Sequence, residues 1–207
     1  MKQHKKILKE DRWSRLYETD RYPFVYESKF RTDGISISTD QLTKEWGSWS
    51  VSERLSFANA FREKLEITAE DETILEFLMA NGDDRVRTTI ATSLTRHSNK
   101  DAVLEFLIQQ LECDLEMAAN YLQALTILGN PKALPAIRSC HTQMLAKIEE
   151  PRGDPDHSLI VSFLSCCATL WKMDGGPAYR DIIRSYLNHA DEPIRNFAKA
   201  CLEKWPL

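Results

Sequence analysis

The sequence lacks any segment typical of a membrane span or of an exported protein. It has no run of about 18 apolar residues, and no apolar stretch follows the charged N-terminus in the manner of a signal peptide. Its five cysteines are odd in number and include no Cys-x-x-Cys pair, which favours reduced, mostly buried thiols over a disulfide framework. We therefore expect a cytoplasmic protein without a membrane partner.

The motifs of common catalytic sites are also missing. The sequence has no nucleophile elbow, no phosphate-binding loop and no His-Glu-x-x-His zinc motif. Cys140 and His141 invite a zinc or thiol-nucleophile interpretation together with His157. However, Cys140 falls on an expected helix between Ile137 and Met144, where a free cysteine is usually a small core residue. We expect no catalytic residue, no cofactor and no metal.

The sequence does contain an internal repeat. Leu-Glu-Phe-Leu occurs at residues 75–78 and returns at residues 104–107, a shift of 104 − 75 = 29 residues. Each repeat opens with an anchor residue and has a leucine eight positions later. The anchors are Phe57, Val86, Met117, Ser162 and Ile194, and the leucines are Leu65, Leu94, Leu125, Leu170 and Leu202. Positions 0, +4 and +8 share one helix face, so each repeat is predicted to begin with an amphipathic helix.

A second amphipathic helix follows the first in the repeat. Its markers are aromatic or aliphatic residues at positions +17 and +20, namely Ile74, Val103, Leu134 and Tyr179, then Phe77, Phe106, Ile137 and Ile182. One helix pair cannot bury its apolar face alone, so repetition at roughly 30 residues predicts a stack of pairs. No part of the array alternates with period two. The prediction is an all-α fold, an α-solenoid of about four and a half helix pairs in a right-handed superhelix.

Local turn signals agree with this periodicity. Ser50 and Glu53 have capping-box spacing for the helix that opens the array. Gly129 is placed to end a first helix, and Asn130-Pro131 is typical of an N-cap followed by proline at the first helical position. Residues 191–193, Asp-Glu-Pro, form another acidic helix start, and residues 39–46 are predicted to form a short helix.

The array also carries an insertion near residues 148–157. The step between the third and fourth anchors is 162 − 117 = 45 residues, against 117 − 86 = 31 for the step before it, so this junction has about 14 extra residues. The segment is polar and rich in helix breakers, and insertions in solenoids often lie on a binding face. Asp154, Asp156 and His157 are candidate metal ligands, but Asp156 is equally an N-cap for the next helix.

Residues 1–50 form a non-repeat N-terminal extension, and residues 51–207 form the array. The extension holds eight of the 19 aromatic residues of the chain. In one interpretation it covers the apolar end of the array, as terminal units must for solubility. In the other, aromatic side chains such as Trp13, Trp46 and Trp49 anchor a protein partner.

Three segments carry a family resemblance. Residues 128–137, Leu-Gly-Asn-Pro-Lys-Ala-Leu-Pro-Ala-Ile, closely resemble the linker and second helix of HEAT-like repeats of the phycobilisome-lyase type. Residues 83–87 and 191–195 are similar to that family's helix start, where an Asp and an Arg flank a branched apolar residue and tie successive units together. The resemblance covers about residues 52–204 and implies the solenoid fold. The first, third and fourth units lack the Asp and Arg.

The resemblance implies several possible functions, because such repeats occur in scaffolds, lyase subunits, hydroxylases and DNA repair proteins. The di-iron hydroxylases use repeated His-Glu pairs, and no His-Glu dipeptide occurs here. The related DNA glycosylases use a basic groove, but this chain has a net charge of −4; residues 1–36 carry 9 − 6 = +3, which leaves −7 for the rest. Nucleic acid is therefore not the expected partner. A local basic patch remains an alternative, formed by Arg138, Lys147, Arg180 and Arg184.

The function expected from these observations is a non-catalytic scaffold or adaptor for a protein partner. In HEAT-like arrays the second helices line the concave face. Glu76 and Glu105 share position +19 in adjacent units, and Arg138 and Arg184 lie near the equivalent faces of later units, so a gradient from acidic to basic is predicted along one groove. The alternative for these four residues is that they are ordinary solvated charges. The alternative function is a phycobilin-lyase-like subunit acting on a tetrapyrrole-carrying client protein.

Overall fold

The computed structural model describes residues 37–64, 66–150 and 156–206. Within these ranges the chain forms helices and no strand, which confirms the all-α prediction. The α-helices are α2 Thr39–Glu45, α3 Val51–Glu63, α4 Ala69–Asn81, α5 Asp84–Leu94, α6 Lys100–Cys113, α7 Ala118–Leu128, α8 Leu134–Ile148, α9 His157–Asp174, α10 Pro177–Ser185 and α11 Glu192–Lys204. Three short 3₁₀ helices accompany them, η1 Trp46–Ser48, η2 Pro131–Ala133 and η3 Tyr186–Asn188.

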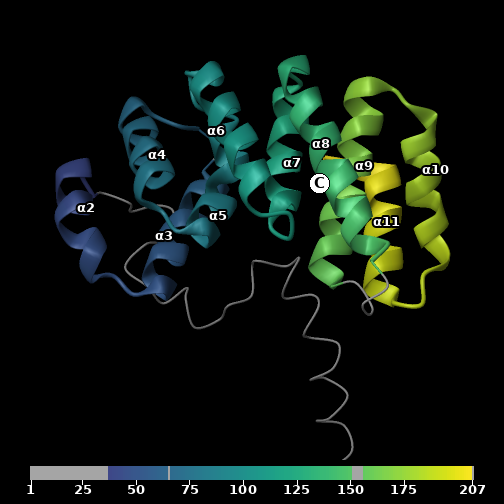
Figure 1. The fold of residues 1–207 in the computed structure, drawn as a ribbon. Coiled ribbons are helices and arrows are strands. Elements are labelled where there is room, and N and C mark those ends of the chain that lie inside the picture. Colours follow the sequence, from purple (N-terminus) through teal and green to yellow (C-terminus); the bar gives the residue numbers. More distant parts are fainter. Residues whose placement is uncertain (1–36, 65, 151–155, 207) are drawn as a thin grey trace, which may run out of the picture.

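The helices pack in two rows (Figure 1). In the first row α3, α5, α7, α9 and α11 each pack against the next. The second row holds α2, α4, α6, α8 and α10; α4 packs on α5, α6 on α7, and both α8 and α10 on α9. α9 is surrounded by α7, α8, α10 and α11, so every residue from Leu159 to Leu170 is buried.

The apolar positions of the repeat form the core between the two rows. The leucines of the repeated phrase, Leu75, Leu78, Leu104 and Leu107, are at most 3% exposed. The first-helix residues at position +4 are buried as well, namely Phe61, Ile90, Tyr121, Cys166 and Ala198. The phenylalanines of the repeated phrase are half-buried and pack against the edge of the core. The burial of these apolar side chains in each repeat unit is the main driving force for this arrangement.

The predicted helix ends are confirmed at several places. The N–H of Glu53 donates to Ser50 Oγ at 3.3 Å, and the carboxylate of Glu53 accepts from the Ser50 N–H at 2.9 Å, which completes the capping box. Gly129 ends α7 with φ of 61°, a left-handed conformation that favours glycine. Asn130 then accepts from the N–H of Lys132 at 3.0 Å and starts η2.

Two arginines join helix starts to the segments before them. Arg87 at the start of α5 donates to the carbonyl of Ala80 in α4 at 3.4 Å. Arg195 in α11 donates to the carbonyl of His189 at 2.6 Å. These contacts occur in the two units where the sequence shows the Asp and Arg pattern. The predicted helix start at residues 191–193 is confirmed, since Asp191 is the N-cap residue of α11 and Pro193 lies in its first turn, although the Asp191 side chain makes no capping bond.

Buried hydroxyl groups link neighbouring helices of the first row. The Thr88 hydroxyl in α5 lies 3.0 Å from the Tyr121 hydroxyl in α7. Further along, Thr126 of α7 and Thr169 of α9 share a hydrogen bond of 2.8 Å, and the indole N–H of Trp205 donates to Thr126 at 3.1 Å. Each of these five polar side chains is thus paired with one on a neighbouring segment, which offsets the cost of burying it.

Candidate partner-binding surface

The tryptophans proposed as partner anchors are not surface residues where the structure describes them. Trp13 lies outside the described residues. Trp46 and Trp49 are each 7% exposed, so their rings have almost no area left for a partner. For residues 37–50 this burial supports the interpretation in which the extension covers the end of the array.

The two tryptophans pack against α3 and α4 through aromatic contacts, and Trp46 adds a hydrogen bond to α4. Trp46 meets Phe77 of α4 edge to face, with ring centroids 5.7 Å apart, and Trp49 meets Phe57 of α3 at 5.3 Å. The indole N–H of Trp46 donates to the carbonyl of Asn81 at 3.2 Å. A buried indole needs such a partner, and here the end of α4 provides it. The rings therefore shield the apolar faces of α3 and α4.

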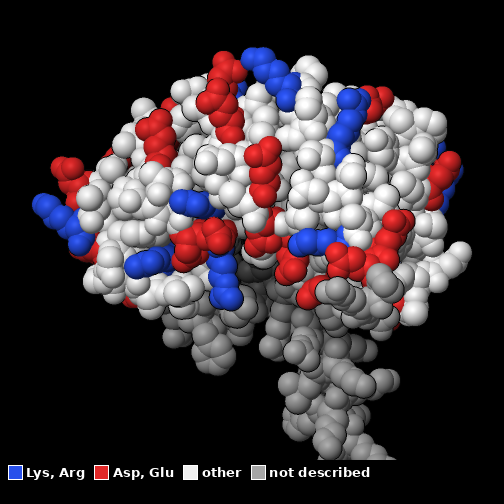
Figure 2. Space-filling view, viewed as in Figure 1, with Lys and Arg blue, Asp and Glu red and all other residues white. Residues whose placement is uncertain are grey.

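The four charged candidates lie on consecutive helices of the second row, and all four are exposed: Glu76 in α4, Glu105 in α6, Arg138 in α8 and Arg184 in α10. Within the helix bounds, α4 has four acidic and no basic residues and α6 has three acidic and one basic, which gives net charges of −4 and −2. α8 has two basic and no acidic residues and α10 has two basic and one acidic, which gives +2 and +1. Acidic side chains gather over α4 and α6 in Figure 2.

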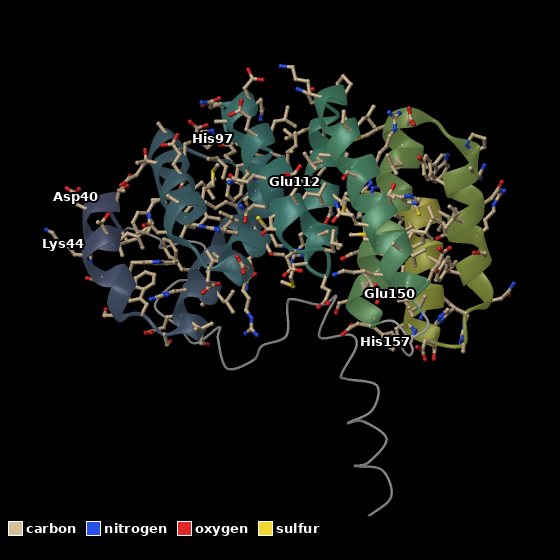
Figure 3. The ribbon with its side chains drawn as sticks, in the orientation of Figure 1. Asp40, Lys44, His97, Glu112, Glu150 and His157 are labelled. Carbon is tan, nitrogen blue, oxygen red and sulfur yellow. The ribbon has the colours of Figure 1, made fainter. Side chains whose placement is uncertain are left out.

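Glu76 is engaged by the turn that precedes α6. Its carboxylate lies 3.5 Å from Nε2 of His97, a ring that is only 3% exposed and is labelled in Figure 3. Nδ1 of His97 accepts from the N–H of Asn99 at 3.0 Å, so a neutral ring carries its proton on Nε2, facing Glu76. One turn earlier in α4, Glu72 accepts from the Ser98 hydroxyl and N–H at 2.8 and 2.6 Å, and these bonds hold the pKa of the Glu72 carboxyl below its ordinary value. Glu76 thus lies beside a histidine, but its side chain is 61% exposed, and contact of Glu76 with a partner stays a prediction.

The remaining three candidates differ in their pairing. The guanidinium of Arg138 donates to Asp174 at 2.8 Å, and that of Arg184 donates to Asp181 at 3.1 Å. These acids reduce the positive potential at the basic end of the surface. Glu105 makes no ion pair or side-chain hydrogen bond with any residue that the structure describes. Of the four, Glu105 is the charge most available to a partner.

The first helices touch one another in an unbroken series, whereas in the described second row the closer contacts are those of α2 with α4 and of α6 with α8. The family resemblance implies that the second helices line a concave face, and this stays a prediction.

The cysteine and histidine candidates for chemistry are packing residues. Cys140, Cys166 and Cys167 are at most 3% exposed, which confirms the core interpretation. Burial raises the pKa of the Cys166 thiol, and it raises that of Cys167 to about 12, so a thiolate nucleophile is disfavoured. His141 is half-buried and stacks on Phe163 with ring centroids 5.2 Å apart.

Asp156 and His157, at the described end of the insertion, make contacts at the starts of α9 and α11. The side chain of Asp156 accepts from the N–H of Ser158 at 2.7 Å, which confirms the N-cap interpretation. Nε2 of His157 lies 2.5 Å from the carboxylate of Asp191, so the histidine links the starts of the two helices. Asp154 lies outside the described residues. In the described ranges, no three His, Cys, Asp or Glu side chains are grouped in a way that could hold a metal ion.

One surface feature was not predicted from the repeat. A pocket of about 190 Å³ lies where the ends of α5 and α7 meet the start of α6. It is lined by Thr95, Lys100, Leu104, Ile127, Leu128 and Asn130. The sequence signal for this pocket is Ile127, which is 48% exposed near the end of α7. At the same position of the repeat, α9 and α11 have the lysines Lys172 and Lys204.

None of the helices in the described ranges is long and apolar enough to cross a bilayer. Comparison with models of known protein families, with curated proteins and with solved structures found no match to this chain. The function must therefore be argued from the residues and the surface alone.

Proposed function

We propose that this protein is a HEAT-like α-solenoid of about four and a half helix pairs that acts as a non-catalytic scaffold or adaptor for another protein. The partner binds the outward surface of α4, α6, α8 and α10. The observation that carries this proposal is the change in charge along that surface, from −4 and −2 on α4 and α6 to +2 and +1 on α8 and α10.

The order of the helices supports the solenoid part of the proposal. α3 with α4, α5 with α6, α7 with α8 and α9 with α10 follow one another as pairs, and α11 adds a final half. The first helix of each pair packs against the first helix of the next. Such a stack exposes one long surface built from equivalent helices, which is the usual binding surface of repeat proteins.

The charge pattern supports the binding part. Opposite signs at the two ends of one surface orient an incoming partner that has the complementary polarity, and they increase the rate of encounter more than the final affinity. Exposed charges act over a screening length of about 8 Å at physiological ionic strength, so binding should weaken as salt is added. A partner that contacts α4 and α6 through basic side chains and α8 and α10 through acidic ones fits this surface.

The test is affinity capture of the tagged chain from cells of its native organism, followed by quantitative mass spectrometry. Glu105→Lys reverses an exposed, unpaired charge at the centre of the acidic half. Glu203→Lys is the matched control, because Glu203 is exposed on α11 in the first row. We expect a captured protein whose recovery falls several-fold with Glu105→Lys and with added salt, and is kept with Glu203→Lys. The proposal fails if no protein is enriched, or if the two variants reduce capture equally.

A further inference from the structure

The pocket beside Ile127 combines apolar lining residues with a cation, Lys100. The side chains of Leu104, Ile127 and Leu128 provide the apolar part, and Lys100 and Asn130 are among the polar ones. Leu104 is 3% exposed, so the pocket reaches down to the core. Its volume of about 190 Å³ suits a single aliphatic side chain.

Ile127 provides apolar surface beside the pocket. Its side chain is 48% exposed at the end of α7, where α9 and α11 have Lys172 and Lys204. α7 shares the lack of a basic residue in its last turn with α4, α5 and α6. What distinguishes Ile127 from other exposed apolar residues is its place on the pocket lining next to Leu128, where an apolar group of a ligand can contact both side chains.

The charges beside the pocket favour an acidic ligand. The ammonium of Lys100 donates to the carbonyl of Thr95 at 2.5 Å, which holds it at the pocket and leaves it further N–H groups. Lys132 is exposed in η2, two residues after Asn130 of the pocket lining. Asp101 follows Lys100 and Glu72 interacts with it, so these two acids equal the two lysines in number. Neither acid lines the pocket, whose one charged lining residue among the described residues is Lys100.

We propose that this pocket binds one aliphatic side chain of a partner peptide in which aspartate or glutamate flanks that side chain. The apolar lining removes the aliphatic group from water, and Lys100 and Lys132 contact the flanking carboxylates. The inference rests on the proposed scaffold function and specifies the chemistry of the partner at one point of contact. Flanking lysines or arginines are repelled by the same two residues.

The test is a titration of the isotope-labelled full chain with three synthetic peptides, followed by ¹H–¹⁵N correlation spectra. The first peptide has two leucines flanked by glutamates, the second has glutamines in place of the glutamates, and the third has lysines. We expect the glutamate peptide to shift the amide signals of Leu104, Leu128 and Asn130. The glutamine peptide should bind about tenfold more weakly, the loss typical of one charge-assisted contact, and the lysine peptide should cause no shift.

Two variants locate the binding. Ile127→Ser should abolish the shifts caused by the glutamate peptide, and Lys100→Gln should reduce its preference over the glutamine peptide. Val51→Ser is the matched control, because Val51 is exposed to 49% on α3 and is not part of the pocket lining. A circular dichroism spectrum of each variant shows that it is folded. Binding that survives Ile127→Ser, or equal binding of the three peptides, overturns the proposal, as does the absence of any shift.

Self-association is a distinct outcome. If sedimentation velocity shows an oligomer that Ile127→Ser dissociates, the pocket binds a second copy of the chain and the peptide proposal is wrong. If Glu105→Lys lowers partner capture while no peptide binds, the scaffold proposal stands and only the pocket proposal fails. If the glutamate peptide binds as expected but no partner is captured, the pocket proposal stands and the scaffold proposal fails.

Discussion

Substitutions at Thr88 of α5 and Tyr121 of α7 test how strongly a hydrogen bond between their hydroxyl groups joins these two first helices. The two residues are 6% and 2% exposed. Oγ1 of Thr88 lies 2.7 Å from the carbonyl of Asp84 and 3.0 Å from the Tyr121 hydroxyl. A threonine hydroxyl has one hydrogen, so we assign that hydrogen to the bond with Asp84, and the tyrosine hydroxyl donates to Thr88.

This assignment predicts unequal effects for the two single substitutions. Tyr121→Phe removes a donor and leaves Thr88 bonded to Asp84, so it should lower the free energy of unfolding by about 1 kcal/mol. Thr88→Val removes the acceptor and leaves the buried O–H of Tyr121 without a partner, so it should lower the free energy of unfolding by roughly 1–3 kcal/mol. In the double variant no buried donor is left unpaired. It should therefore be less destabilised than the sum of the two single variants, by about 1–2 kcal/mol.

The assay is urea unfolding followed by far-ultraviolet circular dichroism at neutral pH, with all variants fitted to a common slope. Thr89→Val provides a matched control. The Thr89 hydroxyl donates to the carbonyl of Arg85 at 2.8 Å, as Thr88 does to Asp84, but in the described residues it has no partner on another helix. Thr89→Val and Tyr121→Phe should therefore be additive to within about 0.5 kcal/mol.

The reasoning is refuted if Thr88→Val and Tyr121→Phe are also additive within that margin. It is also refuted if Tyr121→Phe costs clearly more than Thr88→Val, because the donor would then be assigned to the wrong residue. Additivity would mean that the hydroxyl pair contributes nothing to the joining of α5 and α7, whereas the reversed order of costs would mean that Thr88 is the donor of the bond.

Two further outcomes follow from the structure. Burial raises the pKa of Tyr121 to about 12, so the unfolded chain gives up this proton first, and stability that is complete below about pH 10 should fall by roughly 2 kcal/mol as pH rises to 12. Urea midpoints in this range should fall less steeply for Tyr121→Phe than for the wild type. A Cβ on Gly82 would lie 2.6 Å from the carbonyl of Leu78 and 2.8 Å from Cγ1 of Val86, so Gly82→Ala should cost about 1–3 kcal/mol. Thermal melts should show no such loss for Gly47→Ala, since a Cβ there meets no atom within 4 Å.

Features set by neighbouring residues could be predicted from the sequence. The capping box of Ser50 and Glu53 and the left-handed turn at Gly129 depend on backbone groups only a few positions away. The burial of Leu75 and Leu104 was equally predictable, because a 3.6-residue period determines which face of a helix is apolar.

The pairing of surface charges could not be predicted in this way. Glu105 and Glu76 have the same place in the repeat, yet Glu76 faces His97 and Glu105 remains unpaired in the described residues. The difference arises because the turn at His97 reaches back to α4. Trp46 is a similar case, since an aromatic-rich segment is compatible with either a partner or a cap until its contact with Phe77 is known.

The sequence by itself therefore determined the helices, their ends and their apolar faces, because these depend on interactions between residues close in the chain. Only the tertiary structure decided which charges are paired, which tryptophans are buried and where a pocket forms. The pocket beside Ile127 shows the reason, since its lining comes from the ends of two helices and the start of a third. Such a site exists only after long-range packing has brought these segments together.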